Sequence, residues 1–320
     1  MSTSLNTLIV ERVELATPEV IAVDLVDASG ATLPVWEPGA HIDLHLPSGT
    51  IRQYSLCGDP ADRQRYRVGI LRDANGRGGS IEAHETLAPG VAVQVSVPRN
   101  HFALKEASAY LFVAGGIGVT PLLPMLRAVH AAGTPWQLVY GGRTRESMAF
   151  VEELAQYPAK RVSLLPQDSS GLIDLAGLVA HVAAGTALYS CGPGPMLNAL
   201  EQVCMEAGKS AQLHIERFSA PTTQKQDGGG EQRAFKVELA KSGLTLDVAA
   251  GQSLKATLVK AAIPVPFSCE EGYCGSCETR VIGGEPEHHD SVLTPEEREE
   301  GKFMMVCVGR CKSDLLVLDL

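Results

Sequence analysis

Four cysteines near the end of the chain have a spacing that could bind an iron–sulfur cluster. They follow the pattern C-x4-C-x2-C with a distant fourth cysteine, and they are Cys269, Cys274, Cys277 and Cys307. This is the spacing of plant-type 2Fe–2S ligands. Gly272, Gly275 and Ser276 would let the loop fold tightly and aim backbone N–H groups at the sulfurs. Those donors would stabilise the negative charge of a cluster.

A zinc site is the alternative for these cysteines. Zinc loops usually carry paired C-x2-C knuckles, whereas the second half here has only Cys307, with Cys311 four residues later. The spacing therefore favours the iron–sulfur cluster and leaves Cys311 as an unused neighbour. Cys57 and Cys204 are predicted to be buried apolar residues, because free cysteines are most often buried.

Two glycine turns could bind a dinucleotide. The first contains Gly115, Gly116 and Gly118 and leads through Thr120 into a helix, whose start favours phosphate. The second is the segment 189–196, which again ends a strand and opens a helix. Ligands bind at the carboxyl ends of parallel strands, so both turns should face one crevice. The first turn could also be a simple tight connection.

The second turn places a cysteine where a nicotinamide could lie. It begins with Cys191, Gly192 and Pro193 and continues to Met196. Cys191 could lie against the nicotinamide ring, or it could be a buried thiol at the end of a strand. The glycine–proline turn beside it favours the first reading of this residue.

A third group of residues could bind a flavin. Arg52, Tyr54 and Ser55 lie on a predicted strand, and the turn 77–80 precedes a short helix. Arginine, serine and the N–H groups of a helix start can all bind a phosphate, and Tyr54 could pack on a flat ring. From composition alone, these residues could equally form an ordinary strand and turn.

The elements around these motifs predict several domains. Short strands separated by proline–glycine turns over residues 1–105 predict a closed antiparallel β-barrel. Alternating strands and helices over 106–221, including a helix from about 147 to 156, predict an α/β domain with a parallel sheet. Residues 222–232 contain no apolar side chain and are predicted to be a linker. Residues 233–320 begin with a hairpin and a helix and then carry the cysteines.

Composition limits the class of protein. The 320 residues are 45% hydrophobic and have a net charge of −10, which argues against nucleic acid as a partner. The acidic surface fits docking on a basic protein patch, and it fits plain solubility equally well. No signal peptide and no apolar run of about 18 residues is visible. The chain is therefore expected to be cytoplasmic, with no membrane partner.

The order of the motifs resembles one family. R-x-Y-S, G-R-G-G-S, P-R-N-H-F, G-G-I-G-x-T-P-L-L-P-M and C-G-P-x-P-M precede the ferredoxin-type cysteines. This order is similar to that of the phthalate dioxygenase reductase family, which includes vanillate O-demethylase and carnitine monooxygenase reductases. The resemblance covers nearly the whole chain. It implies an FMN-binding barrel, an NADH-binding domain and an α+β ferredoxin domain of the β-grasp type with a 2Fe–2S cluster.

The resemblance also implies site residues. Those expected at the FMN are Arg52, Tyr54, Ser55, Val68, Gly69, Ile70, Gly78, Gly79, Ser80, Thr120 and Phe218. Those expected at the nucleotide are Gly115, Gly116, Gly118, Arg143, Cys191, Gly192, Pro193 and Met196. Phe218 could instead be a core residue at a domain interface. Ala103 departs from the proline usual in this family after the Asn-His-Phe motif, which leaves these sites unchanged.

The implied activity is that of an oxygenase reductase. NADH gives two electrons as hydride and a 2Fe–2S cluster accepts one at a time, so a flavin must link them. The expected partner is an oxygenase component, and the chain is expected to be monomeric alone, with no residue acting as catalytic acid or base. The alternatives are a donor to a cytochrome P450, a reductase acting directly on small acceptors, or a ferredoxin-like carrier.

Nucleotide preference is open at the level of residues. The strand over 137–140 is followed by Arg143 and Arg145, and no acidic residue stands at that strand end to bind a 2′-hydroxyl. The arginines could bind the 2′-phosphate of NADPH. The family resemblance favours NADH instead.

Overall fold

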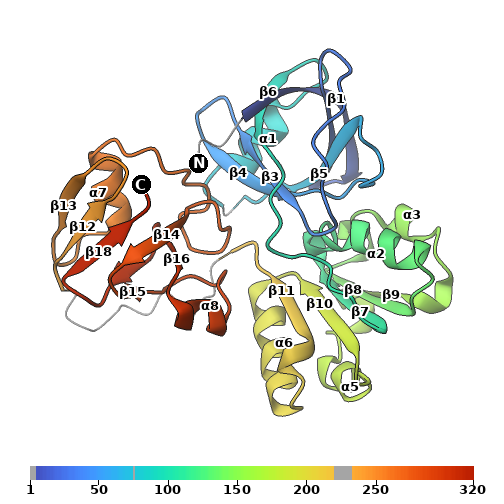
Figure 1. Ribbon diagram of the computed structural model, residues 1–320. Coiled ribbons are helices and arrows are strands. Elements are labelled where there is room, and N and C mark those ends of the chain that lie inside the picture. Colours follow the sequence, from blue (N-terminus) through green and yellow to red (C-terminus); the bar gives the residue numbers. More distant parts are fainter. Residues whose placement is uncertain (1–4, 75, 220–232) are drawn as a thin grey trace. The chain divides into compact units, whose positions relative to one another are not determined.

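The computed structural model describes residues 5–74, 76–219 and 233–320 (Figure 1). These residues form two units that divide between Phe218 and Ser219, and each unit is described by itself. The predicted linker at 222–232 lies outside the described residues. The predicted boundary at 105/106 falls between two sheets of the first unit, and these domain limits stay predictions.

The first sheet is the predicted antiparallel barrel. Its strands and its single helix are β1 (Leu5–Thr17), β2 (Val20–Val26), β3 (His41–His45), β4 (Ile51–Ser55), β5 (Arg65–Leu71), α1 (Gly79–Thr86) and β6 (Ala92–Ser96). The strand order is β4-β3-β6-β1-β2-β5. A bridge between Leu56 and Val68 joins the two edge strands, so the sheet closes on itself. Alternate residues such as Val23 and Ile70 are fully buried inside it.

The second sheet of this unit is parallel. Its strands are β7 (Ala109–Gly115), β8 (Trp136–Gly142), β9 (Val162–Pro166), β10 (Thr186–Cys191) and β11 (Leu213–Glu216), in the order β11-β10-β7-β8-β9. Its main helices are α2 (Leu122–Ala131), α5 (Leu175–Ala180) and α6 (Gly194–Glu206). Phe112 packs with α2 on one face, whereas Leu111 and Val113 pack with α5 and α6 on the other. Helices on both faces confirm the predicted α/β class (Figure 1).

Two local expectations in this sheet were wrong or incomplete. A single helix was expected from about 147 to 156, but a 3-10 turn at Arg145–Ser147 and a short helix α3 (Val151–Leu154) are found. Phe150 between them has a left-handed backbone, with φ 61°. Met148, Ala149 and Phe150 are all buried, which one face of a helix cannot achieve. The strand β11 had not been expected.

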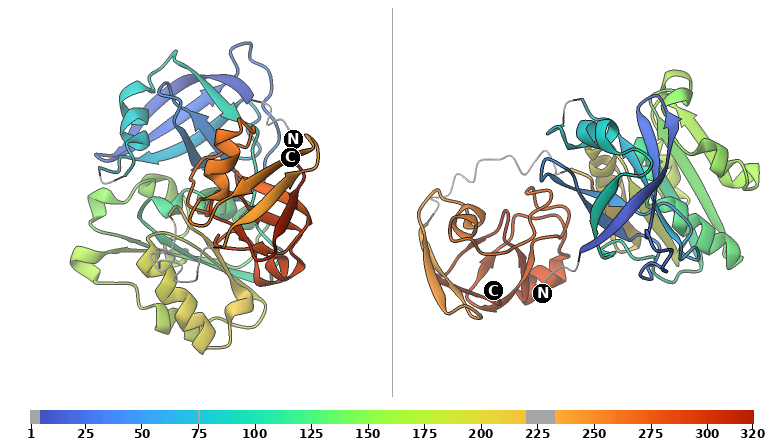
Figure 2. Two further views of the ribbon diagram at one scale, coloured as in Figure 1. Left: turned by 90° about the vertical axis from the view of Figure 1, so that its left-hand side faces the viewer. Right: turned by 90° about the horizontal axis from the view of Figure 1, so that it is seen from above.

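The barrel and the parallel sheet share one hydrophobic core. Val20, Ala22 and Cys57 of the barrel pack in the same cluster as Leu122 and Phe150 of the parallel-sheet part. Figure 2 shows the blue barrel strands lying against the green part of this unit. The two parts of the first unit are therefore held together by apolar packing as well as by the chain.

The second unit is an α+β domain. Its elements are β12 (Phe235–Leu239), β13 (Leu244–Val248), α7 (Leu254–Lys260), β14 (Glu278–Gly283), β15 (Pro286–Glu287), α8 (Pro295–Glu300), β16 (Phe303–Met305), β17 (Arg310–Cys311) and β18 (Leu315–Leu318). The strand order of the main sheet is β13-β12-β18-β14-β16. The central strands β12 and β18 run parallel, and the hairpin β12–β13 and the helix α7 confirm what was expected. No helix among the described residues is both long and apolar enough to cross a bilayer.

Candidate functional site

Arginine and glycine meet where the flavin phosphate is predicted. The helix α1 begins after Gly78, whose φ of 84° requires glycine and which has open space on its side-chain side. A side chain at position 79 would collide with the Arg52 guanidinium, so glycine lets this cation approach the start of the helix. Ser80 Oγ accepts a hydrogen bond of 3.0 Å from the N–H of Asp73 and orders the turn. The arrangement fits an anion.

Tyr54 on β4 has an unsatisfied polar atom. Its hydroxyl is buried and has no hydrogen-bond partner among the described residues. Burial raises the pKa of Tyr54 above its usual value, so the phenol stays protonated and able to donate. A buried donor without a partner is costly. A flat ring carrying hydrogen-bond acceptors would satisfy it, which fits the flavin predicted here.

The neighbouring strand β5 can offer only its backbone to a flavin. Val68 and Ile70 are fully buried and point into the barrel, and the Ile70 carbonyl already lies 2.9 Å from His84 Nε2. Gly69, between them, points to the outer face, where it lies against Thr120 and Phe150. These positions agree with the expectation of a backbone stretch beside the ring.

The two glycine turns of the parallel sheet pack directly against each other. A side chain at position 118 would overlap the carbonyl of Cys191. A side chain at position 115 would lie 2.5 Å from Pro193 Cδ and 3.0 Å from Met196 Sδ. Both turns stand at the carboxyl ends of the adjacent strands β7 and β10. The structure therefore brings the two predicted nucleotide turns together at one edge of the sheet, as expected.

Three residues from distant parts of the first unit gather beside these turns. Ser55 Oγ donates a hydrogen bond of 3.3 Å to Glu216 Oε2, and Glu216 pairs with Cys191 across the strands β10 and β11. Burial raises the pKa of Glu216 to about 8. Burial and the nearby Glu216 also raise the pKa of Cys191, which is fully buried and remains a thiol. Perturbed groups of this kind cluster at functional sites.

Glu216 is the residue that sequence reasoning missed. It lies two residues before Phe218, in the short segment whose strand was not expected. The spacing from Ser55 is 161 residues, so no local pattern links them. Phe218 is 37% exposed and stands at the end of the first unit, so both readings of this residue stay predictions.

The Arg143 turn also gains an unexpected neighbour. The N–H of Asp168, in the short helix α4 (Gln167–Ser170) after β9, donates a hydrogen bond of 3.1 Å to the carbonyl of Arg143. Both side chains are exposed. An acidic residue thus follows the neighbouring strand β9 and has a backbone bond to the Arg143 turn. The end of β8 itself still has no acidic residue, as expected, and the place of the adenosine ribose stays a prediction.

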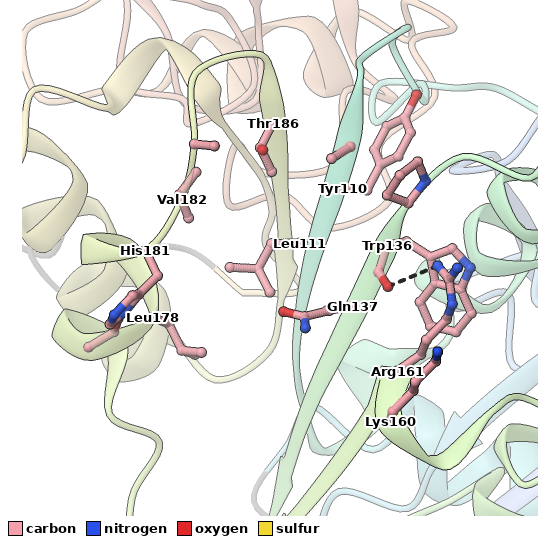
Figure 3. Close-up of a pocket in the computed structure, with 14 residues that line it drawn as sticks. Tyr110, Leu111, Trp136, Gln137, Lys160, Arg161, Leu178, His181, Val182 and Thr186 are labelled. Carbon is pink, nitrogen blue, oxygen red and sulfur yellow. Dashed lines mark hydrogen bonds between the residues drawn. The ribbon is translucent and has the colours of Figure 1, made fainter.

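A separate cavity of about 650 Å³ lies at the other edge of the same sheet (Figure 3). Its walls include Leu111, Gln137 and Thr186 at the amino ends of β7, β8 and β10, with Arg161 and His181 at its sides. Ligands of open α/β sheets bind at the carboxyl ends. This cavity is therefore not expected to bind the nucleotide, whose site is predicted at the glycine turns.

In the second unit, the four predicted cluster ligands converge. Cys269, Cys274, Cys277 and Cys307 are all buried, and none forms a disulfide. The thiol of Cys269 contacts those of Cys274 and Cys307, and Cys307 contacts Cys277. The neighbouring Cys269 and burial raise the pKa of Cys274 above its usual value. Four such thiols can lose their protons together only when cations neutralise them, as the irons of a cluster would.

Backbone donors surround these sulfurs. The N–H of Glu271 lies 3.4 Å from Cys269 Sγ, the N–H of Ser276 reaches Cys274, and that of Gly272 reaches Cys307. Gly272 has a φ of 73°, and a side chain there would lie 2.6 Å from Val308 Cγ2. The loop thus has the donors predicted for a sulfur cluster. Cys311 instead lies near Ser313 and Leu315, away from the four.

Two family models match the chain. Residues 112–202 match the oxidoreductase NAD-binding domain, and residues 237–312 match the 2Fe-2S iron-sulfur cluster binding domain. The first covers both glycine turns, and the second covers all four cysteines. The two matches thus agree with the sites built from the residues.

Full-length relatives decide the family. The chain is 39% identical to the phenoxybenzoate dioxygenase subunit beta of Ectopseudomonas oleovorans over 97% of its own length and 96% of the relative's. It is 36% identical to the solved phthalate dioxygenase reductase, with a TM-score of 0.72 and coverage of 99% and 98%. The chain belongs to the phthalate dioxygenase reductase family. The predicted resemblance and the three-part fold are thereby confirmed.

Membership of the phthalate dioxygenase reductase family also confirms the predicted cofactors, which are FMN, NADH and a 2Fe–2S cluster. The chain is an NADH-dependent flavin and iron–sulfur oxidoreductase. A second solved structure, an intact type IV self-sufficient cytochrome P450 monooxygenase, is 42% identical, with a TM-score of 0.91. The match covers 99% of this chain but only 41% of the P450 protein.

Glu216 should give this reductase a pH dependence. Below about pH 8 its carboxyl group is neutral, and above that it becomes an anion that lies next to Ser55 of the predicted flavin site. An anion there opposes added negative charge. We expect flavin reduction at saturating NADH to slow several-fold as the pH rises through about 8. Glutamine cannot ionise, so stopped-flow absorbance should show no such pH dependence in Glu216→Gln. If the variant has the same pH profile as the wild type, this role of Glu216 is wrong.

Asp168 should favour NADH over NADPH. A carboxylate can accept a hydrogen bond from the ribose 2′-hydroxyl and repels a 2′-phosphate. Asp168→Asn is expected to lower the ratio of kcat/KM for NADH to that for NADPH by about tenfold, the scale of a hydrogen bond to a charged group. Steady-state assays with both nucleotides measure this ratio. If Arg143→Ala shifts it further than Asp168→Asn does, the arginine and not the carboxylate decides.

Proposed function

We propose that this chain is the reductase component of a Rieske-type multicomponent oxygenase. It would oxidise NADH and pass electrons singly, through FMN and a 2Fe–2S cluster, to the oxygenase component. The observation that carries the proposal is the junction of the two glycine turns with Ser55 and Glu216 of the first unit. The junction supports the proposal because hydride transfer requires a nucleotide site and a flavin site that lie close together.

The proposed FMN site lies on the barrel. Arg52 and the turn of Gly78, Gly79 and Ser80 would bind the phosphate, because a cation and the start of a helix meet there. Tyr54 would pack on the ring, with Ser55 and the backbone of Val68, Gly69 and Ile70 at its edge. Thr120 and Phe218 would approach it from the second sheet.

The proposed NADH site lies at the carboxyl edge of the parallel sheet. Gly115, Gly116 and Gly118 would bind the pyrophosphate together with the turn of Gly192, Pro193 and Met196. Cys191 would lie against the nicotinamide ring and Arg143 near the adenosine. Glycine is needed at positions 115, 118 and 192 because the two turns leave no space for side chains between them, whereas Gly116 has open space and a positive φ of 54°.

The protein residues have a positioning task. When bound, FMN accepts a hydride and releases single electrons, and the cluster accepts one electron at a time. Cys191 would exclude water from the nicotinamide face, since it is buried and uncharged. Neutral Glu216 would hold the Ser55 hydroxyl in place. Cys269, Cys274, Cys277 and Cys307 would hold the irons, with backbone N–H groups on their sulfurs.

A second candidate acceptor is a cytochrome P450. The high similarity to the self-sufficient P450 structure, at 42% identity over this chain, favours it. The discriminating experiment supplies the purified reductase with NADH and either a Rieske oxygenase or a P450 from the same source. We expect rapid turnover with the Rieske protein only. Turnover with the P450 alone would overturn the first proposal and support the second.

We also propose that the protein works in the cytoplasm as a monomer, without nucleic acid or membrane partners. The reduced cysteines fit a reducing compartment. The net charge of −10 is unfavourable for a nucleic-acid partner.

Loss of one cluster ligand should separate two activities. Cys277→Ser is expected to leave NADH-to-ferricyanide activity largely intact and to abolish reduction of cytochrome c, because only the second acceptor needs the cluster. Cys311→Ser is the matched control, since Cys311 is buried in the same unit and its thiol contacts Ser313 and Leu315, and it should keep both activities. Equal loss of both activities in Cys277→Ser would show that the cluster is needed for folding instead.

A further inference from the structure

On its outer face, the barrel strand β5 has one position without a side chain, and this position faces the parallel-sheet part. Strands β2 and β5 pair Ala22 with Gly69 and Asp24 with Arg67. Paired residues point to the same side of a sheet, and their neighbours point to the other side. Val68 therefore points inward to the barrel core, and Gly69 presents an outer position with no side chain.

Phe150 fills this gap. A side chain at position 69 would lie 3.0 Å from Phe150 Cε2 and Cζ and 2.8 Å from Thr120 Cγ2. The backbone of Gly69 does not have a positive φ, so glycine is needed here for space and not for conformation. The ring of Phe150 and the methyl group of Thr120 thus touch the predicted flavin strand directly.

The backbone of Phe150 is held in an uncommon conformation. Its φ of 61° and ψ of 18° are left-handed, which aromatic residues rarely adopt. Such a conformation persists only when the surroundings fix it. Phe150 is buried in the core shared by the barrel and the parallel sheet, so packing between the two parts fixes it.

A chain of charges runs beside this contact. Buried Asp24 accepts a bond of 2.7 Å from Arg67 Nε, and Arg67 Nη1 lies 3.2 Å from Glu153 Oε1. Glu153 Oε2 lies 2.7 Å from Arg127 Nη2. Arg127 Nη1 in turn donates to the carbonyl of Cys57, at 2.9 Å. Glu153 is therefore the carboxylate that joins an arginine of the barrel to an arginine of α2.

We propose that Phe150 and Glu153 are positioning residues for hydride transfer. The Phe150 ring sets the distance between the parallel-sheet part and the flavin strand β5. Glu153 keeps the two parts from sliding past each other, because it pairs with Arg67 of the barrel and with Arg127 of α2. The proposal rests on the proposed function, which places FMN on the barrel and the nicotinamide at the glycine turns. Neither residue need touch a cofactor, because both act through the backbone of β5 and through α2.

The test compares three variants of the full-length holoprotein. Phe150→Leu keeps an apolar side chain but shortens it, and Glu153→Gln keeps the shape but removes the charge. Glu152→Gln is the matched control, because Glu152 is the exposed adjacent residue of the same short helix. Flavin content, melting temperature, anaerobic flavin reduction by NADH and the long-wavelength charge-transfer absorbance are measured for each variant.

We expect Phe150→Leu and Glu153→Gln to bind flavin and reduce it about tenfold more slowly at saturating NADH, the scale of a misplaced reactant. The KM for NADH should change little, because the dinucleotide turns are intact. The charge-transfer absorbance, which requires the two rings to stack, should weaken. Glu152→Gln should match the wild type in all measurements.

Three outcomes would count against the proposals, and they are distinguishable. In the first, Phe150→Leu and Glu153→Gln show the same rate of flavin reduction and the same charge-transfer absorbance as the wild type and Glu152→Gln. The positioning role is then wrong, and the proposed function stands. If NADH does not reduce the flavin of the wild type, the proposed function itself fails. In the third, the test variants reduce their flavin more slowly, but only in proportion to a lower flavin content or a lower melting temperature. The two residues then have a structural role and not a positioning role.

Discussion

The close contact between two backbone turns is the constraint on which the first unit depends. The backbone at Gly118 approaches the carbonyl of Cys191 so closely that any side chain would overlap it. This approach is possible only because β7 and β10 are adjacent and parallel, so that their carboxyl ends meet. The elements that hold these strands, α2 on one face and α5 with α6 on the other, therefore also fix the geometry of the proposed nucleotide site.

The proposed flavin site and the proposed cluster site differ in the charge that their surroundings favour. In the first unit, burial keeps Glu216 and Cys191 protonated, so these two groups add no negative charge beside the nucleotide turns at neutral pH. In the second unit, four thiols gather where their negative charges could not coexist without cations. Backbone N–H groups supply partial positive charge there without a formal cation. The first arrangement fits a site that gains electrons, and the second fits a site that binds metal.

The parts that could be predicted from the sequence are those whose residues are close along the chain. The cysteine spacing and the glycine turns are of this kind, because each ligand loop is one short segment. Glu216 and Asp168 could not be predicted, since the first meets Ser55 across 161 residues and the second meets Arg143 through one backbone hydrogen bond beyond the paired strands β8 and β9. The expected helix around residue 150 failed for a related reason. Packing against the barrel outweighs helical propensity at Phe150.

The strand β5 shows how one segment serves two purposes. Val68 and Ile70 fill the barrel interior, and their large buried side chains stabilise the fold. Arg67 and Gly69, on the opposite side, provide a charge and an empty position to the parallel-sheet part. The strict alternation of a strand keeps these purposes separate. It follows that even the smallest side chain at position 69 would move the contact with Phe150.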